Sequence, residues 1–224
     1  MKTADVIIVG SGASGLFNAL FLPQDYKVIV ITKKTVEESD SFLAQGGISA
    51  LKNPEDYDSY FEDTMKAGHY ENDKGAVEKM IKESPQIIQD LKDFGVRFDL
   101  KDGEIEFTRE GGHSTFRILH HEDLTGKEIT SHLYEEAKKR DNITIMENCM
   151  MIDIIEKDGE CKGIVYKDQD GNFDTIEAPD TVLATGGLGG LFKHSTNFRH
   201  LTADSLATVS YTHLRAHETS AHLV

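Results

Sequence analysis

The 224-residue chain has only two cysteines and no cluster of basic residues. Cys149 and Cys161 form neither a CxxC motif nor a disulfide framework, so we expect reduced thiols in a cytoplasmic protein. Lys and Arg number 24 against 39 Asp and Glu, which gives a net charge of −15. A chain this acidic repels phosphate backbones and anionic lipid, and nucleic-acid binding is therefore disfavoured.

Long apolar runs are also missing. The longest ones, Val6–Val9 and Val28–Ile31, have the length of strands, which excludes a transmembrane segment. The N-terminus passes directly into a strand, with no apolar signal region or cleavage site, so we do not expect secretion. Repeats, low-complexity tracts and Pro/Gly/Ser linkers are absent, and the hydrophobic share of 38% suits a real core. One interrupted α/β domain is the simplest interpretation.

The first 34 residues predict a βαβ unit. Val6–Val9 is a continuous apolar run, as expected for a central parallel strand that is covered on both faces. A helix is expected next, from the apolar spacing of Leu16, Phe17, Ala19, Leu20 and Leu22, and it should end near Pro23. The second strand is Val28–Ile31.

A glycine motif connects the first strand to the helix. Gly10-x-Gly12-x-x-Gly15 stands in the context that supports dinucleotide binding, because it follows an apolar strand and opens a helix. Gly10 would form the tight turn, Gly12 would let a diphosphate approach, and Gly15 would let the helix pack on the strand. The acidic ribose contact expected after Ile31 is replaced by Thr32-Lys33-Lys34, which counts against NAD.

The rest of the chain continues the α/β pattern. Helical spacing covers residues 57–95 and 123–140, and turn-rich residues 96–122 suit hairpins or a substrate-facing excursion. Further strands are expected at residues 143–146, 152–155, 163–166 and 181–184, with a hairpin turn at Asp158-Gly159. Two more glycine elements, Gly46-Gly47 and Gly186-Gly187, would let backbone approach a flat ligand.

Several motifs together resemble one enzyme family. They are Gly10–Gly15, Thr32-Lys33, residues 41–48, the Thr108-Arg109-Glu110-Gly111-Gly112-His113-Ser114 block, Arg117-Ile118-Leu119-His120, Asp123-x-Thr125-Gly126 and residues 184–187. Over residues 1–207 the chain is similar to the L-aspartate oxidase family, which belongs with the flavoprotein subunits of succinate dehydrogenase and fumarate reductase. The resemblance implies a Rossmann-like FAD-binding domain, with a parallel sheet, helices and an inserted β-hairpin or meander.

The resemblance also implies which residues contact FAD. The diphosphate would be held by Ser11, Gly12, Ala13 and Ser14, with Gly10 and Gly15 shaping the turn, and Lys33 would lie beside the adenosine ribose. The ribityl chain and flavin edge would be wrapped by Asp40, Ser41, Phe42, Leu43, Ala44, Gln45, Gly46 and Gly47. Ala184, Thr185, Gly186 and the late acidic residue Asp204 would complete the site. Asp40 occupies the position of the histidine that binds flavin covalently in respiratory relatives, so non-covalent FAD is expected.

The implied reaction is oxidation of L-aspartate to iminoaspartate, the first step of NAD biosynthesis, with oxygen or fumarate as electron acceptor. Glu110 stands where the family places a carboxylate near the substrate's amino group, and His113 and His120 are candidate contacts for the substrate carboxylates. The family's catalytic arginine has no match in this chain, so no catalytic residue is assigned. The family further implies transfer of the unstable imine to quinolinate synthase.

The resemblance does not extend to the end of the chain. We interpret residues 1–207 as an incomplete FAD-binding domain and residues 208–224 as a non-native or disordered tail. His213, His217 and His222 in this tail lack acidic or Cys partners, so no metal site is predicted. Because family members are much longer, we expect an inactive N-terminal fragment that binds FAD weakly.

Three alternatives differ in what they require. A nicotinamide-dependent dehydrogenase needs an acidic residue after Ile31 and a substrate domain. A fumarate reductase or succinate dehydrogenase flavoprotein subunit is disfavoured by Asp40 and Glu110. A non-catalytic FAD-binding module would show a flavin spectrum without activity.

Overall fold

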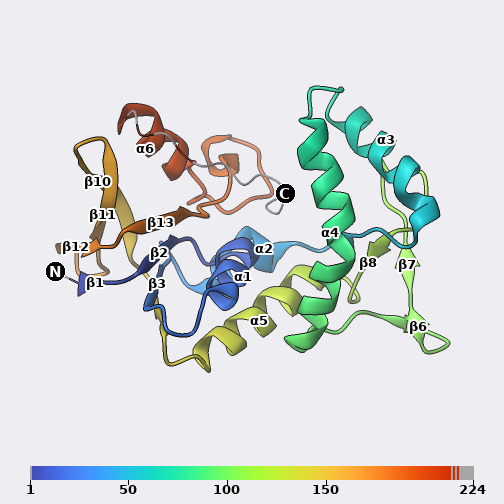
Figure 1. Cartoon of the computed structure of the whole chain (residues 1–224), viewed down its shortest axis with the longest axis horizontal. Coiled ribbons are helices and arrows are strands. Elements are labelled where there is room, and N and C mark those ends of the chain that lie inside the picture. The colour runs from blue at the N-terminus through green and yellow to red at the C-terminus, as the bar shows by residue number, and fades with distance from the viewer. Residues whose placement is uncertain (1, 213, 215, 217–224) are drawn as a thin grey trace. The chain divides into compact units, whose positions relative to one another are not determined.

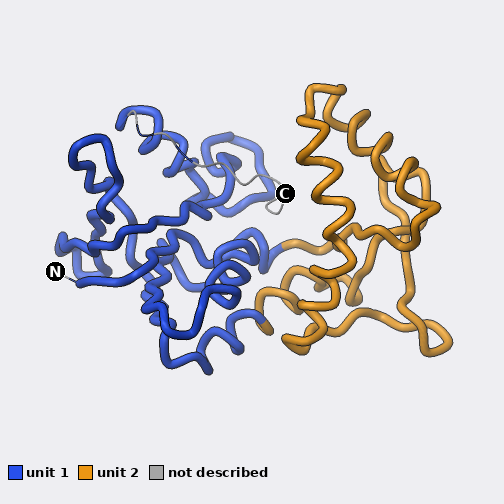
Figure 2. Tube along the Cα trace, viewed as in Figure 1, with its two compact units in different colours: residues 1–43, 133–217 blue, residues 44–132, 218–224 orange. Residues whose placement is uncertain are grey.

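The computed structural model describes residues 2–212, 214 and 216, and the chain divides into two compact units (Figures 1 and 2). The first unit combines residues 1–43 with residues 133–217, and the second contains residues 44–132. The expected interrupted α/β domain is thus an α/β unit whose interruption is itself a compact unit.

A four-stranded parallel sheet forms the centre of the first unit. Its strand order is β13-β2-β3-β9, and Val6 of β2 pairs with Val28 on one side and Asp180 on the other. Every residue of β2 and β3 is buried, as their continuous apolar runs predict. The strands are β2 (Val6–Val9), β3 (Val28–Ile31), β9 (Ile143–Met146) and β13 (Asp180–Leu183).

The two faces of this sheet are covered differently, because successive strand side chains point to opposite faces. Val6 and Ile8 pack with Ala19 of helix α1 (Ala13–Phe21). Ile7 and Val9 pack instead in a cluster with residues of a second sheet. The central strands therefore lie in the middle of a helix–sheet–sheet arrangement.

The second sheet is the predicted meander. Its order is β1-β12-β11-β10, and the hairpin between β10 and β11 turns at Asp158 and Gly159, which both have positive φ. The strands are β1 (Lys2–Thr3), β10 (Met150–Lys157), β11 (Glu160–Lys167) and β12 (Phe173–Glu177). Short helices also belong to the unit: η1 (Val36–Glu38), α2 (Asp40–Leu43), η3 (Gly189–Leu191) and α6 (Asp204–Thr212). Helix α6 thus includes residues 208–212, which were expected to belong to a non-native or disordered tail.

The second unit is built on two packed helices, α3 (Tyr57–Ala67) and α4 (Lys74–Asp93), preceded by η2 (Pro54–Asp56). Their buried cluster consists of Tyr60, Met65, Val77 and Ile81. The small sheet β4-β8-β7 and the hairpin β5–β6 accompany them, so the hairpins expected in residues 96–122 are confirmed. These strands are β4 (Ile48–Ser49), β5 (Leu100–Lys101), β6 (Glu104–Ile105), β7 (Phe107–Thr108) and β8 (Ile118–Leu119). Helix α5 (Thr125–Lys138) follows.

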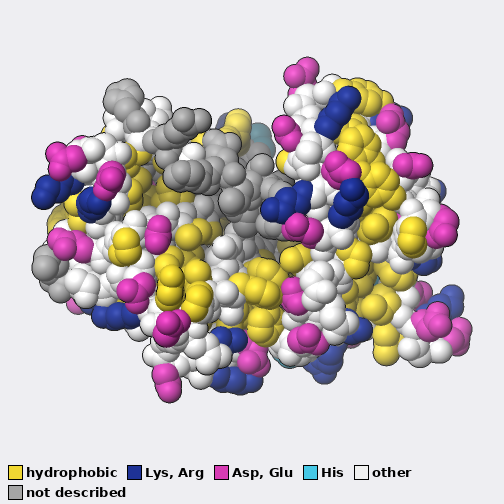
Figure 3. All heavy atoms as spheres, in the orientation of Figure 1, with side chains coloured by type: hydrophobic (Ala, Val, Ile, Leu, Met, Phe, Trp, Pro, Cys, Tyr) yellow, Lys and Arg dark blue, Asp and Glu magenta, His cyan; other side chains and the backbone are white. Residues whose placement is uncertain are grey.

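The acidic composition is visible on the surface, and the two cysteines are free thiols. Acidic side chains lie over both units on the face drawn in Figure 3, with Lys and Arg side chains among them. Cys149 is buried and Cys161 is half-buried, and both thiols are free. No helix among the described residues combines the length and apolarity that a bilayer crossing requires. The predicted α/β class, with a parallel sheet, helices and an inserted meander, is confirmed.

Candidate functional site

The turn between β2 and α1 requires glycine at two positions. Gly10 has φ +114°, and a Cβ there would lie 2.1 Å from the carbonyl oxygen of Ala184. A Cβ on Gly15 would lie 2.0 Å from the carbonyl oxygen of Gly10. The roles assigned to both glycines from the sequence, a tight turn and close helix packing, therefore have a geometric basis.

The N-terminus of α1 is equipped to receive an anion. Gly12 is its N-cap residue and supplies no side-chain hydrogen bond to the first turn, which begins at Ala13. The hydroxyl oxygens of Ser11 and Ser14 are buried and have no hydrogen-bond partner. Buried polar atoms are normally satisfied, so these two hydroxyls fit a bound polar group such as a diphosphate.

Lys33 and Asp204, both predicted to contact the cofactor, form an ion pair. Lys33 Nζ lies 2.5 Å from Asp204 Oδ2 and also donates to the carbonyl oxygen of His200 at 2.8 Å and to Thr202 Oγ1 at 3.0 Å. An ammonium has three donors, so the protein already uses all of them. In this geometry Lys33 fixes residues 200–204 beside the end of β3.

Asp40 has a similar anchoring geometry. Its Oδ1 accepts the Phe198 N–H at 3.0 Å and its Oδ2 accepts from the Asn197 side chain. The residues that follow, Ser41, Phe42 and Leu43, complete the short helix α2, and Ser41 Oγ lies 2.8 Å from where a Cβ of Gly12 would stand. The structure thus brings this predicted flavin segment to the diphosphate turn within the first unit.

The end of β13 supplies the remaining predicted contacts of the first unit. Ala184 donates its N–H to Val9 O at 2.8 Å, which keeps it beside the glycine turn. Thr185 hydrogen-bonds Ser205 through their hydroxyls, and Gly186 has φ +72°. Ligands of open α/β sheets bind outside the carboxyl ends of the strands, and these residues occupy that place.

The other predicted flavin residues belong to the second unit, where hydrogen bonds to their backbone carbonyls hold them. Ala44 O accepts the Gly126 N–H at 2.9 Å, and Gly46 O accepts from Thr125 Oγ1 at 3.3 Å. Gly47 packs so closely on β8 that a Cβ would lie 2.4 Å from Ile118 Cγ2. The segment that contains Gln45 is therefore fixed to the start of α5 and to β8.

A cavity of about 440 Å³ opens beside this segment. It collects four of the predicted residues, Gln45, Gly46, Glu110 and His120. The Glu110 carboxylate lies against Gly46, with Oε1 2.8 Å from where a Cβ of that glycine would be. The full lining is Gln45, Gly46, Thr108, Glu110, His120, Glu122 and Asp123, in which three carboxylates outnumber one imidazole. This cavity favours a positively charged group.

The structure places the two candidate histidines in different surroundings. His120 lines the cavity, and its Nδ1 lies 3.2 Å from Asp99 Oδ2. His113 does not belong to the cavity lining; its Nδ1 accepts a hydrogen bond from Arg117 Nη1 at 3.1 Å, and its ring is tilted against Tyr60.

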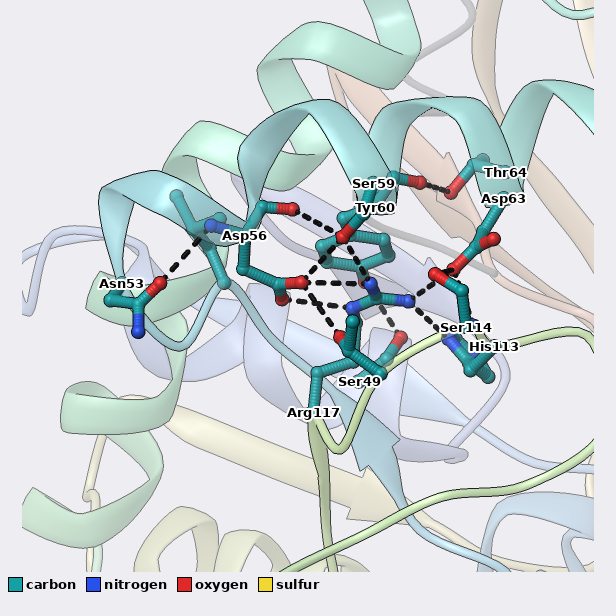
Figure 4. A network of polar contacts seen from close by, with 12 residues as sticks. Ser49, Asn53, Asp56, Ser59, Tyr60, Asp63, Thr64, His113, Ser114 and Arg117 are labelled. Carbon is teal, nitrogen blue, oxygen red and sulfur yellow. Dashed lines mark hydrogen bonds and ion pairs between the residues drawn. The ribbon is translucent and has the colours of Figure 1, made fainter.

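Arg117 is the centre of a buried polar network (Figure 4). Its side chain is fully buried, and Nε and Nη2 donate to the two oxygens of Asp56 at 2.9 and 2.8 Å. Nη2 also donates to Ser59 at 2.8 Å, and Nη1 donates to Asp63 at 2.6 Å as well as to His113. All five N–H groups of the guanidinium are therefore used. The network fastens residues 113–117 to η2 and α3.

This network makes the stability of the fold depend on pH in the acidic range. Hydrogen bonds from Arg117 lower the pKa of Asp56 from 3.8 to about 2. A lowered pKa stabilises the fold above pH 3.8, and that contribution is lost as the pH falls towards 2. We expect Asp56 to account for about 2 kcal/mol of the stability lost between about pH 5 and pH 2. Urea unfolding across this range should show a smaller loss in Asp56→Asn than in the natural chain, and equal losses would contradict the prediction.

Sequence reasoning missed the partners of these residues. Asp56, Asp63 and Asp99 stand outside the glycine-rich motifs, and Arg117 was noted only as part of a motif. Asp56 and Asp63 lie 61 and 54 residues from Arg117, so no local spacing reveals the pairs. Within the described part of the chain, no group of three His, Cys, Asp or Glu residues is arranged to hold a metal. His213, His217 and His222 lie outside the described residues.

Comparison with known proteins adds a family to this geometry. A family model described as "FAD binding domain" matches residues 5–222. The chain is 44% identical over 205 residues to an L-aspartate oxidase of Clostridium perfringens, covering 92% of this chain and 46% of that protein. It is 46% identical over 204 residues to an L-aspartate oxidase of Clostridium acetobutylicum, covering 91% of this chain and 47% of that protein. The chain thus spans about half the length of these relatives.

Solved structures agree with the sequence matches. The Sdh1 complex of Mycobacterium smegmatis in the apo form has a chain with a TM-score of 0.84 and 31% identity, covering 93% of this chain and 38% of that one. A quinol-fumarate reductase with menaquinol molecules matches with a TM-score of 0.87 and 26% identity, covering 93% and 37%. The glycine turn, the unsatisfied hydroxyls at the start of α1 and the family match lead to one conclusion: this chain belongs to the FAD binding domain family, and FAD is its cofactor.

Proposed function

We propose that this chain is the FAD-binding part of an L-aspartate oxidase, which converts L-aspartate to iminoaspartate. Bound FAD supplies the hydride acceptor for the substrate Cα–H, and oxygen or fumarate takes the electrons afterwards. The chain's own residues bind and orient both molecules. The proposal is supported by the similarity to enzymes named L-aspartate oxidase and by the charge of the cavity beside Gly46.

The observation that carries the substrate assignment is the position of Glu110. Its carboxylate lies against Gly46, in the segment proposed to border the flavin, and Glu122 and Asp123 line the same cavity. An ammonium group about 4 Å from one carboxylate gains roughly 1 to 4 kcal/mol, depending on how far water is excluded. A dicarboxylate without an amino group would be repelled there. L-aspartate is therefore favoured over succinate.

The remaining parts of the proposal concern how FAD is held and where the product goes. Ser11, Ser14 and the N-terminus of α1 would hold the diphosphate. Asp40 provides no imidazole for a covalent flavin link, so we propose that FAD is bound non-covalently. We also propose a cytoplasmic enzyme that supplies its imine product to quinolinate synthase in NAD biosynthesis.

A flavin spectrum tests this function. The purified chain would be incubated with FAD, passed through gel filtration, and titrated with L-aspartate or succinate while the flavin band is recorded. Because an incomplete domain should bind FAD weakly, we expect a fraction of the FAD to co-elute and L-aspartate to perturb the flavin band by binding, without turnover, at lower concentration than succinate. A stronger response to succinate would favour a fumarate reductase or succinate dehydrogenase subunit. Co-eluting FAD with no response to either acid would favour a non-catalytic FAD-binding module.

The role of Glu110 can be tested with one substitution. Glu110→Gln removes the negative charge at nearly constant volume. The preference for L-aspartate, measured as the ratio of the succinate and L-aspartate concentrations that half-change the flavin band, should therefore fall by about tenfold or more. The control is Glu104→Gln, because Glu104 is an exposed residue of the β5–β6 hairpin. An unchanged preference in Glu110→Gln would remove Glu110 from the substrate site.

A further inference from the structure

One nitrogen of His120 is committed by its neighbour Asp99. Nδ1 lies 3.2 Å from Asp99 Oδ2, and an ionised carboxylate can only accept hydrogen bonds. A bare Nδ1 would set its lone pair against this carboxylate oxygen, so the neutral ring should carry its proton on Nδ1. This leaves Nε2 as a bare acceptor on a side chain that lines the acidic cavity.

Asp99 is itself held in place by several hydrogen bonds. Oδ2 accepts the Glu122 N–H at 2.8 Å, while the Asp99 N–H donates to His120 O at 2.8 Å and the Asp99 carbonyl accepts the Glu106 N–H at 2.9 Å. Glu122 has φ +46°, a conformation that L-residues seldom adopt without support. The structure therefore holds the Asp99 carboxylate in place beside the His120 ring.

Other charged groups complete the surroundings. His121 Nδ1 lies 3.4 Å from Asp99 Oδ1, and His121 Nε2 lies 3.8 Å from Glu128 Oε2. Glu128 is in turn paired with Arg97 at 3.2 Å and His132 at 3.1 Å. The residues of these pairs do not line the cavity, whereas Glu110, Glu122 and Asp123 line it together with His120.

We propose that His120, oriented by Asp99, accepts a hydrogen bond from the substrate ammonium through Nε2 and so selects an amino acid over a plain dicarboxylate. The inference rests on the proposed function. An ammonium offers three donors, and a neutral imidazole accepts one of them without adding charge. A substrate carboxylate has only acceptors and gains nothing from a bare nitrogen. His120 is thus a specificity residue for the amino group, and Asp99 is its positioning residue.

His113 provides an internal comparison, because its Nδ1 faces a hydrogen-bond donor whereas Nδ1 of His120 faces an acceptor. Both hydrogens of Arg117 Nη1 are donated, one to Asp63 and one to His113 Nδ1. Nδ1 of His113 must therefore be bare, which places the proton on Nε2. The two histidines are expected to be opposite neutral tautomers in one molecule.

Nitrogen-15 NMR of the histidine rings tests the tautomers directly. At about pH 8, above the ordinary titration range of imidazole, His120 should show a protonated Nδ1 and a bare Nε2, and His113 the reverse. His120→Asn and His113→Asn assign the two signals. A protonated Nε2 and bare Nδ1 in His120 would overturn the inference, whatever the flavin experiments show.

Substitution of Asp99 separates its acceptor role from its charge. Asp99→Ala should let His120 populate both tautomers and lower the preference for L-aspartate over succinate by about tenfold. Asp99→Asn should keep the wild-type tautomer and preference, because the amide oxygen can accept from His120 and Glu122. Asp102→Ala, in the exposed β5–β6 turn, is the control, and circular dichroism checks that each variant folds. Loss of preference in Asp99→Asn equal to that in Asp99→Ala would overturn the positioning role.

A final titration separates this contact from the proposed reaction. With FAD present, L-aspartate should shift the His120 Nε2 signal, and succinate should not. Absence of a shift with L-aspartate would overturn the ammonium contact. A shift that accompanies an unchanged flavin band would count against the proposed oxidation and leave the contact standing.

Discussion

Replacing Arg117 with methionine is expected to lower the free energy of unfolding by about 3–5 kcal/mol. The substitution keeps much of the side-chain volume but leaves the carboxylates of Asp56 and Asp63 without their main partner. Both are largely shielded from water, with side-chain exposures of 8% and 16%. Unpaired charges in such places are costly, whereas the intact pair gains from full hydrogen bonding.

Urea unfolding followed by circular dichroism measures this loss. The matched control is Arg97→Met, because Arg97 is also paired with a carboxylate of the same unit, Glu128, but is 73% exposed. Glu128 is itself only 11% exposed, but it keeps the Arg97 backbone N–H at 3.0 Å and His132 at 3.1 Å when the Arg97 side chain is replaced, so the control should change stability by less than Arg117→Met. A similar effect of the two substitutions would show that burial of Arg117 is not what makes its ion pairs important.

The second large effect is expected at the glycine turn. Gly10→Ala would place a Cβ 2.1 Å from the Ala184 carbonyl oxygen at a residue with φ +114°. Backbone on both sides of the contact must move, so we expect a loss of at least about 3 kcal/mol of stability. The same movement separates β2 from the end of β13, and FAD should no longer co-elute with the chain in gel filtration.

The control for this prediction is the same substitution in a helix. Gly75→Ala lies in the first turn of α4, where the added Cβ would come within 3.2 Å of only one atom, Asp73 Oδ1 at the end of a side chain. Alanine is favoured over glycine in helices by up to about 1 kcal/mol, so Gly75→Ala should be neutral or stabilising and should retain FAD. Retention of FAD by Gly10→Ala would contradict the role assigned to the turn.

Sequence patterns predicted the centre of the first unit well because burial there is uniform. The runs at residues 6–9 and 28–31 coincide with β2 and β3, and the apolar stretch at residues 143–146 coincides with β9. β2 and β3 are parallel strands that are buried at every residue, and such strands need continuous apolar side chains, whereas the edge strand β9 is buried only in part. The glycine motif adds a turn of fixed geometry between them.

The same reasoning failed where tertiary contacts decide the backbone. Helical spacing over residues 57–95 predicted one helical stretch, but the structure has α3 and α4 with a break between them. His69 and Tyr70 both have positive φ there, and Tyr70 is held by its hydroxyl on Glu62 at 2.6 Å. Positive φ is rare for such residues, so the sequence gives little warning; Gly68 before the break and Asp73 as the next N-cap were the available signals.

The candidate site was predictable only in part for a similar reason. Motif resemblance located Glu110 and His120, which line the cavity, but it gave no information about hydrogen-bond partners. Asp99 and the Arg117 network come from segments that are distant in sequence and have no recognisable spacing. Only the folded chain shows that His113 and His120, seven residues apart in neighbouring motifs, contact opposite kinds of partner.

The order of the strands has a consequence for synthesis on the ribosome. β2 lies between β3 and β13, and Val6 pairs with Asp180, so the sheet cannot be completed until almost the whole described chain has emerged. The segment between the two parts of the first unit, residues 44–132, has its own helices, hairpins and buried cluster and is synthesised long before β13. We expect it to acquire structure during translation, while β2 and β3 wait with apolar faces exposed and need protection from aggregation.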